Sequence, residues 1–427
     1  MIYTILSSAP SGLAYFTASA AFVDLLRRLC NFQNKASQYP SILYHSDSRV
    51  ASIVEKVQEE LFSYSNNWLL GLLDPNGELQ TAYMLFSRKV LMNKKPEYDR
   101  EIFNLVDGGC VGLDWIRDEG RDDISKPLVI LMHGLAGHTR SQHLVGCAKT
   151  LKEQGFYVVS FVARGCGGVP LTTPETFTAA RTSDYRAVIK YLADKYPNRK
   201  INACGFSLGA GLLLKFLGEE GSDCLLSSAV AVSPSYDMTD GMRTPQFEKY
   251  EKLGMCQSLV DLVKRHEKFL KTHPDSKLDW DGMVNAKTIK QFDQAAIVGK
   301  KTGTGSPPGG EDFGSPQRLT GVVDDFLHFA SVEDYYVASS SIHFSHLIQV
   351  PCLSISSVDD PVCSHRGVPT NIQQVGKGLV VLKTYHGGHV AFVDNPIGSH
   401  GIKYGYGSAW SDRMVSTWFK AANDSSL

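Results

Sequence analysis

Residues 201–220 of the chain read INACGFSLGAGLLLKFLGEE. The first four residues form a short apolar run typical of a buried strand, and from Leu208 onward the pattern is that of a helix. Between the two lies Gly-Phe-Ser-Leu-Gly, centred on Ser207. A serine in a tight turn from strand to helix is the arrangement of a nucleophile elbow, and such a turn leaves no room for side chains at Gly205 and Gly209. The stretch therefore predicts a nucleophilic serine at the edge of a sheet.

Short apolar runs and longer amphipathic patterns alternate along the rest of the chain. The short runs are branched and bounded by Gly, Pro or polar residues, as buried strands are. Alternation of strands with helices requires crossover connections, so we expect an α/β fold with a mostly parallel central sheet and helices on both faces. The expected strands are 128–132, 157–162, 201–204, 229–232, 352–355 and 379–383, and the expected helices are 141–152, 183–195, 208–219 and 411–421.

The organisation outside these elements is less regular. Residues 1–100 form an N-terminal extension with one helical pattern, roughly 50–64, and residues 101–427 contain the α/β domain. Residues 238–340 are largely helical in pattern and separate two expected strands, so we expect them to form a lid inserted over the sheet. Within this insertion, residues 299–321 are rich in Gly, Pro, Ser and Thr, which predicts a flexible loop.

The first 23 residues contain no charged side chain and precede Asp24, Arg27 and Arg28. Their length suits a membrane span, but several serines, a glycine and a proline dilute the apolar character. The basic start of a signal peptide is missing. The sequence leaves open a membrane anchor, an interfacial helix and a docked helix. In an anchored protein, the arginine pair would place the catalytic part on the cytoplasmic side.

Composition and charge restrict the class of protein. The chain has 427 residues with 43% hydrophobic content, which is enough for a packed core. Its 43 Lys and Arg against 44 Asp and Glu give no electrostatic reason to expect nucleic acid as a partner. Nine scattered cysteines without a Cys-x-x-Cys pair argue against a disulfide framework or a structural zinc site, and indicate buried free thiols. The oligomeric state is not indicated.

A second glycine-containing loop, residues 133–138, reads HGLAGH and follows the expected strand 128–132. Its small residues allow the backbone to approach a ligand closely. The amide of Leu135, paired with the amide of Leu208, is therefore the expected oxyanion hole. We expect His133 to support the loop rather than to transfer protons.

A nucleophilic serine requires a general base, and the sequence offers two histidines after the last expected strand. His389 follows two glycines, which let its loop reach toward Ser207, so we predict it as the base. His386 is the competing candidate, and it also fits a surface loop. A metal site built on His386 and His389 is a further alternative, for which no third ligand stands out.

The base in turn requires an acid that orients it. Asp359 and Asp360 follow the expected strand 352–355, at the edge where sites of α/β proteins form. We expect Asp359 to be the acid, because Asp360 precedes Pro361 and suits the turn itself. Asp360 is the alternative. The order serine, aspartate, histidine along the chain is the one expected when all three lie on one such sheet.

Several further pieces match a known family. They are NGELQT at 76–81, the DGG at 107–109 with LDW at 113–115, HGLAG, RGCGG at 164–168, GFSLGA, LGEEG at 217–221, EDYY at 333–336, VDDP at 358–361 and HGGH at 386–389. With these motifs the sequence resembles the alpha/beta-hydrolase superfamily. The resemblance is closest to the branch of medium-chain fatty-acid ethyl-ester synthase/esterases and related lipid hydrolases.

The resemblance implies a serine carboxylesterase of lipid metabolism that acts on medium-chain acyl esters through an acyl-enzyme. It maps the triad onto Ser207, Asp359 and His389 and requires no metal or organic cofactor. Arg164 is expected to brace neighbouring loops and Asp334-Tyr335-Tyr336 to pack. Some members carry an N-terminal membrane anchor. The chain departs from the family in the 299–321 insertion and in Glu78, where the family usually has histidine.

Several functions remain compatible with these residues. An alcohol acyltransferase, a phospholipase and an acylglycerol lipase would share the same triad. A peptidase or a thioesterase would keep the mechanism and change the substrate. A scaffold that kept the fold without activity is the alternative from another class.

Overall fold

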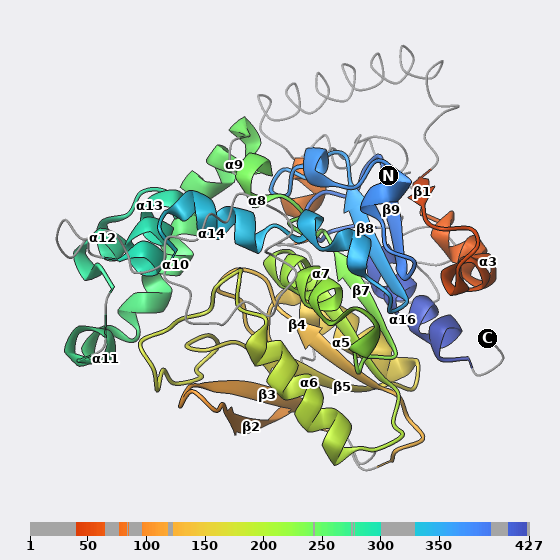
Figure 1. Cartoon of the computed structure of the whole chain (residues 1–427), viewed down its shortest axis with the longest axis horizontal. Helices are drawn as coiled ribbons and strands as arrows, with labels where there is room; N and C mark the ends of the chain where they lie inside the picture. The colour runs from red at the N-terminus through yellow and green to blue at the C-terminus, as the bar shows by residue number, and fades with distance from the viewer. Residues whose placement is uncertain are drawn as a thin grey trace, which may run out of the picture.

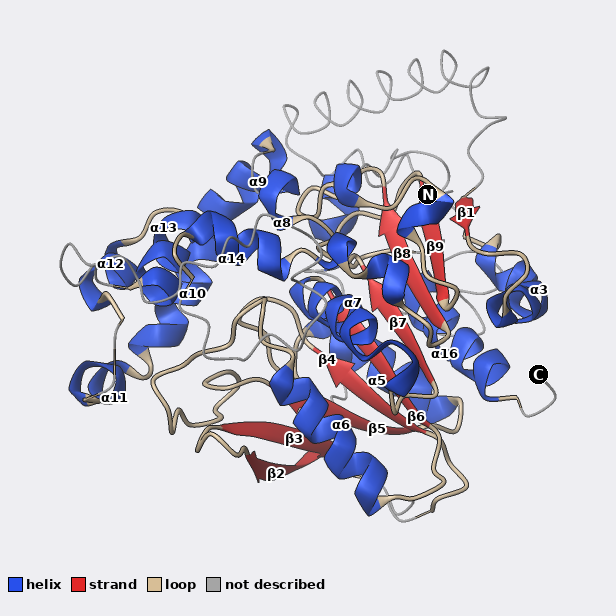
Figure 2. Cartoon of the chain, viewed as in Figure 1, coloured by secondary structure: helices blue, strands red, loops and turns tan. Residues whose placement is uncertain are grey.

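The fold is a central sheet with helices on both of its faces (Figures 1 and 2). The computed structural model describes residues 40–64, 77–82, 84, 96–117, 123–241, 244–274, 276, 278–299, 329–393 and 409–424. Within these residues the sheet has nine strands in the order β1-β9-β8-β7-β6-β4-β5-β3-β2. The predicted α/β class is confirmed.

The centre of the sheet is parallel and its two edges are antiparallel. Strands β4 to β9 pair in parallel with one another, whereas β1 joins β9 and the β2–β3 hairpin joins β5 in antiparallel pairing. The parallel strands are the six expected from their apolar runs. The strands are β1 Ser41–Leu43, β2 Tyr98–Asn104, β3 Cys110–Ile116, β4 Leu128–Met132, β5 Tyr157–Val162, β6 Ile201–Phe206, β7 Ser228–Val232, β8 Cys352–Ser357 and β9 Leu379–Thr384.

Each face of the sheet has its own hydrophobic core, because successive side chains of a strand point to opposite faces. In β4, Val129 and Leu131 pack with α3, α5 and α16, while Leu128 and Ile130 pack with α6 and α7. Both faces of the central strands are therefore buried, as a parallel sheet requires. The helices that cover the sheet are α3 Arg49–Leu61, α5 Gln142–Glu153, α6 Ser183–Lys195, α7 Leu208–Glu220 and α16 Trp410–Asn423.

The N-terminal region contributes directly to this domain. Strand β1 extends the sheet beyond β9, and α3 packs against α16. The Trp410 indole nitrogen donates a hydrogen bond to the carbonyl of Glu60 at 3.0 Å. The expectation for residues 1–23 lies outside the described residues. Among the described helices, none combines the length and the apolar character needed to cross a bilayer.

The described residues between β7 and β8 are largely helical and lie to one side of the sheet (Figure 1), and the lid remains a prediction. The expected loop falls almost entirely outside the described residues, which stop at Gly299 and resume at Phe329. The insertion contains α8 Met238–Gly241, α9 Pro245–Tyr250, α10 Cys256–Lys264, α11 Glu267–Thr272, α12 Trp280–Asn285, α13 Ile289–Asp293 and α14 Val332–Ser339, with π-helical turns at Glu251–Met255 and Gln294–Val298.

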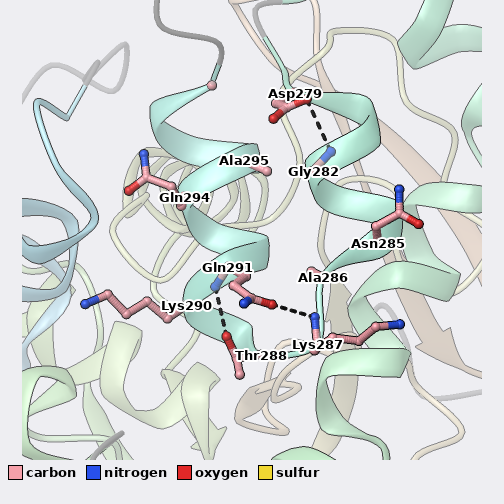
Figure 3. A pocket seen from close by; sticks show the side chains of 11 residues that line it. Asp279, Gly282, Asn285, Ala286, Lys287, Thr288, Lys290, Gln291, Gln294 and Ala295 are labelled. Atoms are coloured by element: carbon pink, nitrogen blue, oxygen red, sulfur yellow. Dashed lines mark hydrogen bonds between the residues drawn. The ribbon is translucent and has the colours of Figure 1, made fainter.

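The insertion carries a cavity of about 700 Å³ on α12, α13 and the turn that follows them (Figure 3). Its wall is partly polar, with Asp279 capping Gly282 and the side chain of Gln291 accepting a hydrogen bond from the Lys287 amide. No residue of the elbow or of the histidine loop lines it. This cavity is therefore separate from the site described next.

Candidate active site

Ser207 lies where β6 ends and α7 begins, as predicted. Its backbone has φ 55° and ψ −123°, a conformation that side-chain-bearing residues rarely adopt. The amide of Ser207 donates to the carbonyl of Val232 on β7, which ties this strained turn to the sheet. The hydroxyl is consequently held above the carboxyl ends of the central strands, next to the N-terminus of a helix.

The two elbow glycines are required by contact. A Cβ atom at Gly205 would lie 2.6 Å from the carbonyl oxygen of Gly209, and one at Gly209 would lie 2.3 Å from the carbonyl oxygen of His133. The second contact shows that the elbow packs directly on the loop after β4. A Cβ atom at Gly134 would in turn lie 3.1 Å from Cβ of Ser207. Both loops therefore meet at the serine.

This meeting point suits the predicted oxyanion hole. Leu208 is the first residue of α7, so its amide precedes the hydrogen-bonded ladder of the helix. Leu135 follows Gly134, the residue that touches Ser207. The pair remains a prediction as an oxyanion hole, and the placement of the two loops is compatible with it.

His133 braces the loop. Its Nε2 accepts a hydrogen bond from the amide of Ala163 at 3.1 Å, so its Nδ1 carries the proton and donates to the carbonyl of Gly134 at 2.7 Å. Burial lowers the pKa of His133 to about 4, which keeps the ring neutral. A neutral, buried ring with both nitrogens engaged fixes Gly134 beside Ser207, in agreement with the role expected from the sequence.

His389 reaches Ser207 from the loop after β9. Its Nε2 is 2.8 Å from Oγ of Ser207, which is hydrogen-bond distance for a general base. Its backbone amide donates to Oγ1 of Thr81 at 2.8 Å, and Thr81 donates to the carbonyl of Gly77 at 2.7 Å. The segment around Thr81 thus holds the histidine in place from outside the sheet. Thr81 lies in a motif that the sequence analysis quoted, but nothing in the motif points to this contact.

The carboxylate that orients His389 is Asp360, so the expectation of Asp359 was wrong. Oδ2 of Asp360 is 2.9 Å from Nδ1 of His389. Asp359 instead accepts from Nδ1 of His386 and from the amide of Gly388, each at 3.0 Å. The two adjacent carboxylates therefore serve two different histidines.

The physical reason for the error lies in the turn before Pro361. Oδ1 of Asp360 accepts from the amides of Val362 and Cys363, both at 2.8 Å, so Asp360 does form the turn, as expected. The same side chain also faces His389, since its second oxygen remains available. Turn formation and orientation of the base are therefore not exclusive roles, because one carboxylate performs both.

The environment of His389 favours its charged form. Burial works to lower the pKa of His389, but the adjacent Asp360 carboxylate raises it. The side chain of Asp360 is only 2% exposed and that of His389 is 12% exposed, so water screens their interaction weakly. The carboxylate can therefore stabilise the imidazolium that forms when the serine gives up its proton.

His386 does not reach the serine in place of His389. It pairs with Asp359, and the carboxylate also binds the amide of Gly388 in the same loop. Gly387 and Gly388 both have positive φ, and a Cβ atom at Gly388 would lie 2.4 Å from the carbonyl oxygen of Gly77. The pair therefore shapes the loop that presents His389.

The two other motifs with expected structural roles make buried contacts of their own. Arg164 is 2% exposed and forms ion pairs with Asp107 and Asp184 at 2.6 and 2.7 Å, which ties the loop after β5 to the β2–β3 turn and to the first turn of α6. Tyr336 donates to Asp293 at 3.0 Å, and Tyr335 accepts from the Ala179 amide at 2.9 Å. Both observations agree with the sequence expectation.

One residue beside the site was not singled out by the sequence. Sγ of Cys363 lies within 4.8 Å of a ring nitrogen of His389 and of a carboxylate oxygen of Asp360, and burial raises the pKa of the thiol. From the sequence, Cys363 was expected only to be a buried free thiol. Its position follows from the Asp360 turn, which no sequence pattern revealed.

The comparisons with known proteins found similar sequences over most of the chain. A family model described as serine aminopeptidase, S33, matches residues 123–296, which include the loop at 133–138 and the elbow. The Caenorhabditis elegans protein abhd-3.2 is 28% identical over 302 residues, covering 70% of this chain and 72% of the relative. Human phospholipase ABHD3 is 26% identical, covering 72% of this chain and 70% of its own.

A yeast protein extends the match over more of the chain. Medium-chain fatty acid ethyl ester synthase/esterase 2 of Saccharomyces cerevisiae is 27% identical, covering 80% of this chain and 83% of the relative. Among solved structures, the Penicillium alpha/beta hydrolase GrgF is 16% identical with a TM-score of 0.45, covering 77% of this chain and 99% of that one. In its sheet order, its elbow and its sequence matches, this chain is similar to proteins of the alpha/beta-hydrolase superfamily.

Proposed function

We propose that this protein hydrolyses carboxylic esters of lipids, with a preference for medium-chain acyl groups, through an acyl-enzyme on Ser207. One observation carries the proposal: the continuous hydrogen-bonded chain from Ser207 through His389 to Asp360. The relatives named as a phospholipase, a monoacylglycerol lipase and an ethyl ester synthase/esterase support a lipid ester as the substrate class.

The arrangement supports two-step acyl transfer. Oγ of Ser207 attacks the ester carbonyl while Nε2 of His389 accepts its proton, and Asp360 holds Nδ1–H and stabilises the imidazolium. The amides of Leu135 and Leu208 bind the oxyanion of the tetrahedral intermediate. His389 then protonates the leaving alcohol. Water, activated by the same histidine, releases the acid and restores Ser207.

An apolar surface beside the triad supports the acyl-chain part of the proposal. Leu135, Ala136 and Val362, which flank the oxyanion loop and the Asp360 turn, pack with lid residues such as Leu259 and Val263. The helical insertion thus brings hydrophobic side chains to the loops that hold the catalytic groups. Binding sites for acyl chains are built from such surfaces.

The test is turnover of p-nitrophenyl esters of increasing acyl length by the wild type and by Ser207→Ala. Loss of the nucleophile is expected to lower turnover on the order of a million-fold. The wild type is expected to peak at medium chain length. Equal turnover by the two proteins would refute the proposal, and a peak at acetate would refute the chain-length part alone.

Alcohol acyl transfer is the second candidate, because the yeast relative is named for both synthesis and hydrolysis. Both reactions pass through the same acyl-enzyme, and they differ in whether water or an alcohol accepts the acyl group. Product analysis with and without added ethanol separates them. Ethyl ester formed in excess of free acid would favour transfer, and free acid alone would favour hydrolysis.

The N-terminal segment extends the proposal to a membrane surface. We propose that residues 1–23 attach the protein to a membrane with the catalytic domain on the cytoplasmic side, based on the uncharged segment followed by Arg27 and Arg28. Carbonate extraction of the tagged full chain tests this. Release into the soluble fraction would exclude a spanning anchor.

A further inference from the structure

Three metal-binding side chains of different chemistry meet beside Ser207. One ligand atom each from Asp360, Cys363 and His389 lies within 4.8 Å of the other two. The three are a carboxylate, a thiol and an imidazole. Acyl transfer uses the first and the last, but it gives the thiol no role.

The turn that Asp360 forms before Val362 and Cys363 also holds the cluster in place. Oδ1 of Asp360 binds the amides of Val362 and Cys363, which turns the chain back and brings the thiol to the carboxylate. His389 approaches from another loop and is fixed at its backbone by Thr81. Little ordering of the chain would therefore remain when a ligand binds.

The donor set matches a thiophilic divalent cation. Zinc accepts thiolate, imidazole and carboxylate, often as three protein ligands with a fourth position open. With zinc bonds of about 2.0–2.3 Å, ligand atoms around a tetrahedral ion lie roughly 3.4–3.6 Å apart. The separations here are all within 4.8 Å, and that between Oδ2 of Asp360 and Nδ1 of His389 is 2.9 Å, so side-chain movements of about 1 Å bring the three atoms to this spacing. Because thiolate is a soft ligand, magnesium and calcium are not the preferred ions for this set.

We propose that Asp360, Cys363 and His389 form a binding site for zinc or a similar thiophilic divalent cation, and that occupancy inhibits the enzyme reversibly. Binding replaces the thiol proton by a metal–sulfur bond and releases that proton to solvent, without any change of oxidation state. The ion also bonds to Asp360 and to Nδ1 of His389, the nitrogen that faces this carboxylate, and the Nδ1 proton moves by way of solvent to Nε2. The histidine then cannot accept the proton of Ser207. The inference goes beyond the proposed function, because metal binding does not require the protein to turn over an ester.

The direct test measures metal binding to the full chain through the absorption spectrum of bound cobalt. Titration of the chelator-treated protein with CoCl₂ is expected to give a sulfur-to-cobalt charge-transfer band near the ultraviolet, displaced stoichiometrically by ZnCl₂. Ser207→Ala should retain the band, since Ser207 is not a ligand. Cys363→Ser should lose it and weaken zinc binding at least tenfold, as expected for loss of a ligand.

A matched cysteine supplies the control. Cys224 is also partly exposed and free, but lies after α7, away from the cluster. Cys224→Ser should bind cobalt and zinc as the wild type does. An unchanged band in Cys363→Ser, or loss of the band in Cys224→Ser with Cys363 intact, would overturn the proposal. Because Cys363→Ser could disturb packing, Asp360→Asn is a second variant, and it should also weaken zinc binding at least tenfold.

Inhibition is measured separately, with each variant compared with its own rate in chelator. ZnCl₂ should suppress wild-type ester turnover and fluorophosphonate labelling of Ser207, and excess chelator should restore both. The inhibitory concentration should rise at least tenfold in Cys363→Ser and stay unchanged in Cys224→Ser. Zinc bound by the cluster without inhibition would refute the regulatory part. Cobalt binding by a chain that hydrolyses no ester would refute the proposed function and leave the metal site intact.

Discussion

Replacing Asp360 by asparagine separates the two carboxylates that follow β8. An asparagine keeps Oδ1, so it can still accept from the amides of Val362 and Cys363, and the turn should persist. Its second atom becomes an amide nitrogen that faces Nδ1 of His389. That amide donates rather than accepts, so the imidazole should carry its proton on Nε2. Nε2 then cannot accept the proton of Ser207.

The magnitude follows from this loss of the correct tautomer. The equivalent change in a serine protease triad lowers kcat by about ten thousand-fold. At 1.4 kcal/mol per factor of ten, this corresponds to about 5.5 kcal/mol of transition-state stabilisation. The matched variant, Asp359→Asn, keeps one acceptor for the Gly388 amide and weakens only the contact with His386. A single hydrogen bond of about 1 kcal/mol predicts a loss of roughly fivefold.

The assay is kcat on a p-nitrophenyl ester, with the thermal midpoint of both variants measured as a check on folding. The expected ranking is a much larger loss in Asp360→Asn than in Asp359→Asn. If Asp359→Asn lost activity by the larger factor while both proteins remained folded, the assignment of Asp360 would be refuted and the original sequence-based choice restored.

Three further predictions follow from the contacts around the site. Because Asp360 raises the pKa of His389, activity in metal-free buffer should fall as pH drops through a value above 6.5. In Asp360→Asn the acid limb of the pH–rate profile should move to lower pH. An acid limb at the same pH in both proteins would contradict this. Thr81→Val removes the acceptor for the His389 amide, so kcat should fall about fivefold with KM little changed. An unaltered kcat would show that Thr81 does not position His389. Gly209→Ala places a Cβ 2.3 Å from the carbonyl oxygen of His133. It should therefore lower the free energy of unfolding, measured in urea, by about 1–3 kcal/mol or more. An unchanged free energy of unfolding would show that the elbow tolerates a side chain.

Local patterns were enough to predict the centre of the fold and the position of Ser207 in its strand-to-helix turn. The parallel strands are continuous apolar runs, because both faces of the sheet are covered, and the elbow glycines sit at fixed spacing around Ser207. The edge strand β2 was not predicted, because its sequence is YDREIFN and its contacts to β3 are polar. Arg100 pairs with Asp114 at 2.6 Å, and the Trp115 indole donates to Glu101 at 2.8 Å. A search for hydrophobic alternation does not detect a strand held in this way.

The parts of the site that could not be predicted depend on the direction of side chains and on contacts between segments far apart in the sequence. Which of Asp359 and Asp360 faces His389 is decided by the turn at Pro361, not by the residue types. Thr81 binds the amide of His389 across 308 positions of the chain. Such a contact leaves no signal in one sequence, because nothing local in either segment requires the other.

The central claim is that the hydroxyl of Ser207 is activated by His389, and covalent labelling tests it most directly. A fluorophosphonate probe is applied to the wild type, Ser207→Ala and His389→Ala, and the modified peptide is identified by mass spectrometry. The account predicts a single adduct on Ser207 in the wild type, none in Ser207→Ala and strongly slowed labelling in His389→Ala. Labelling of Ser207→Ala at the wild-type rate, or an adduct on another residue in the wild type, would contradict it.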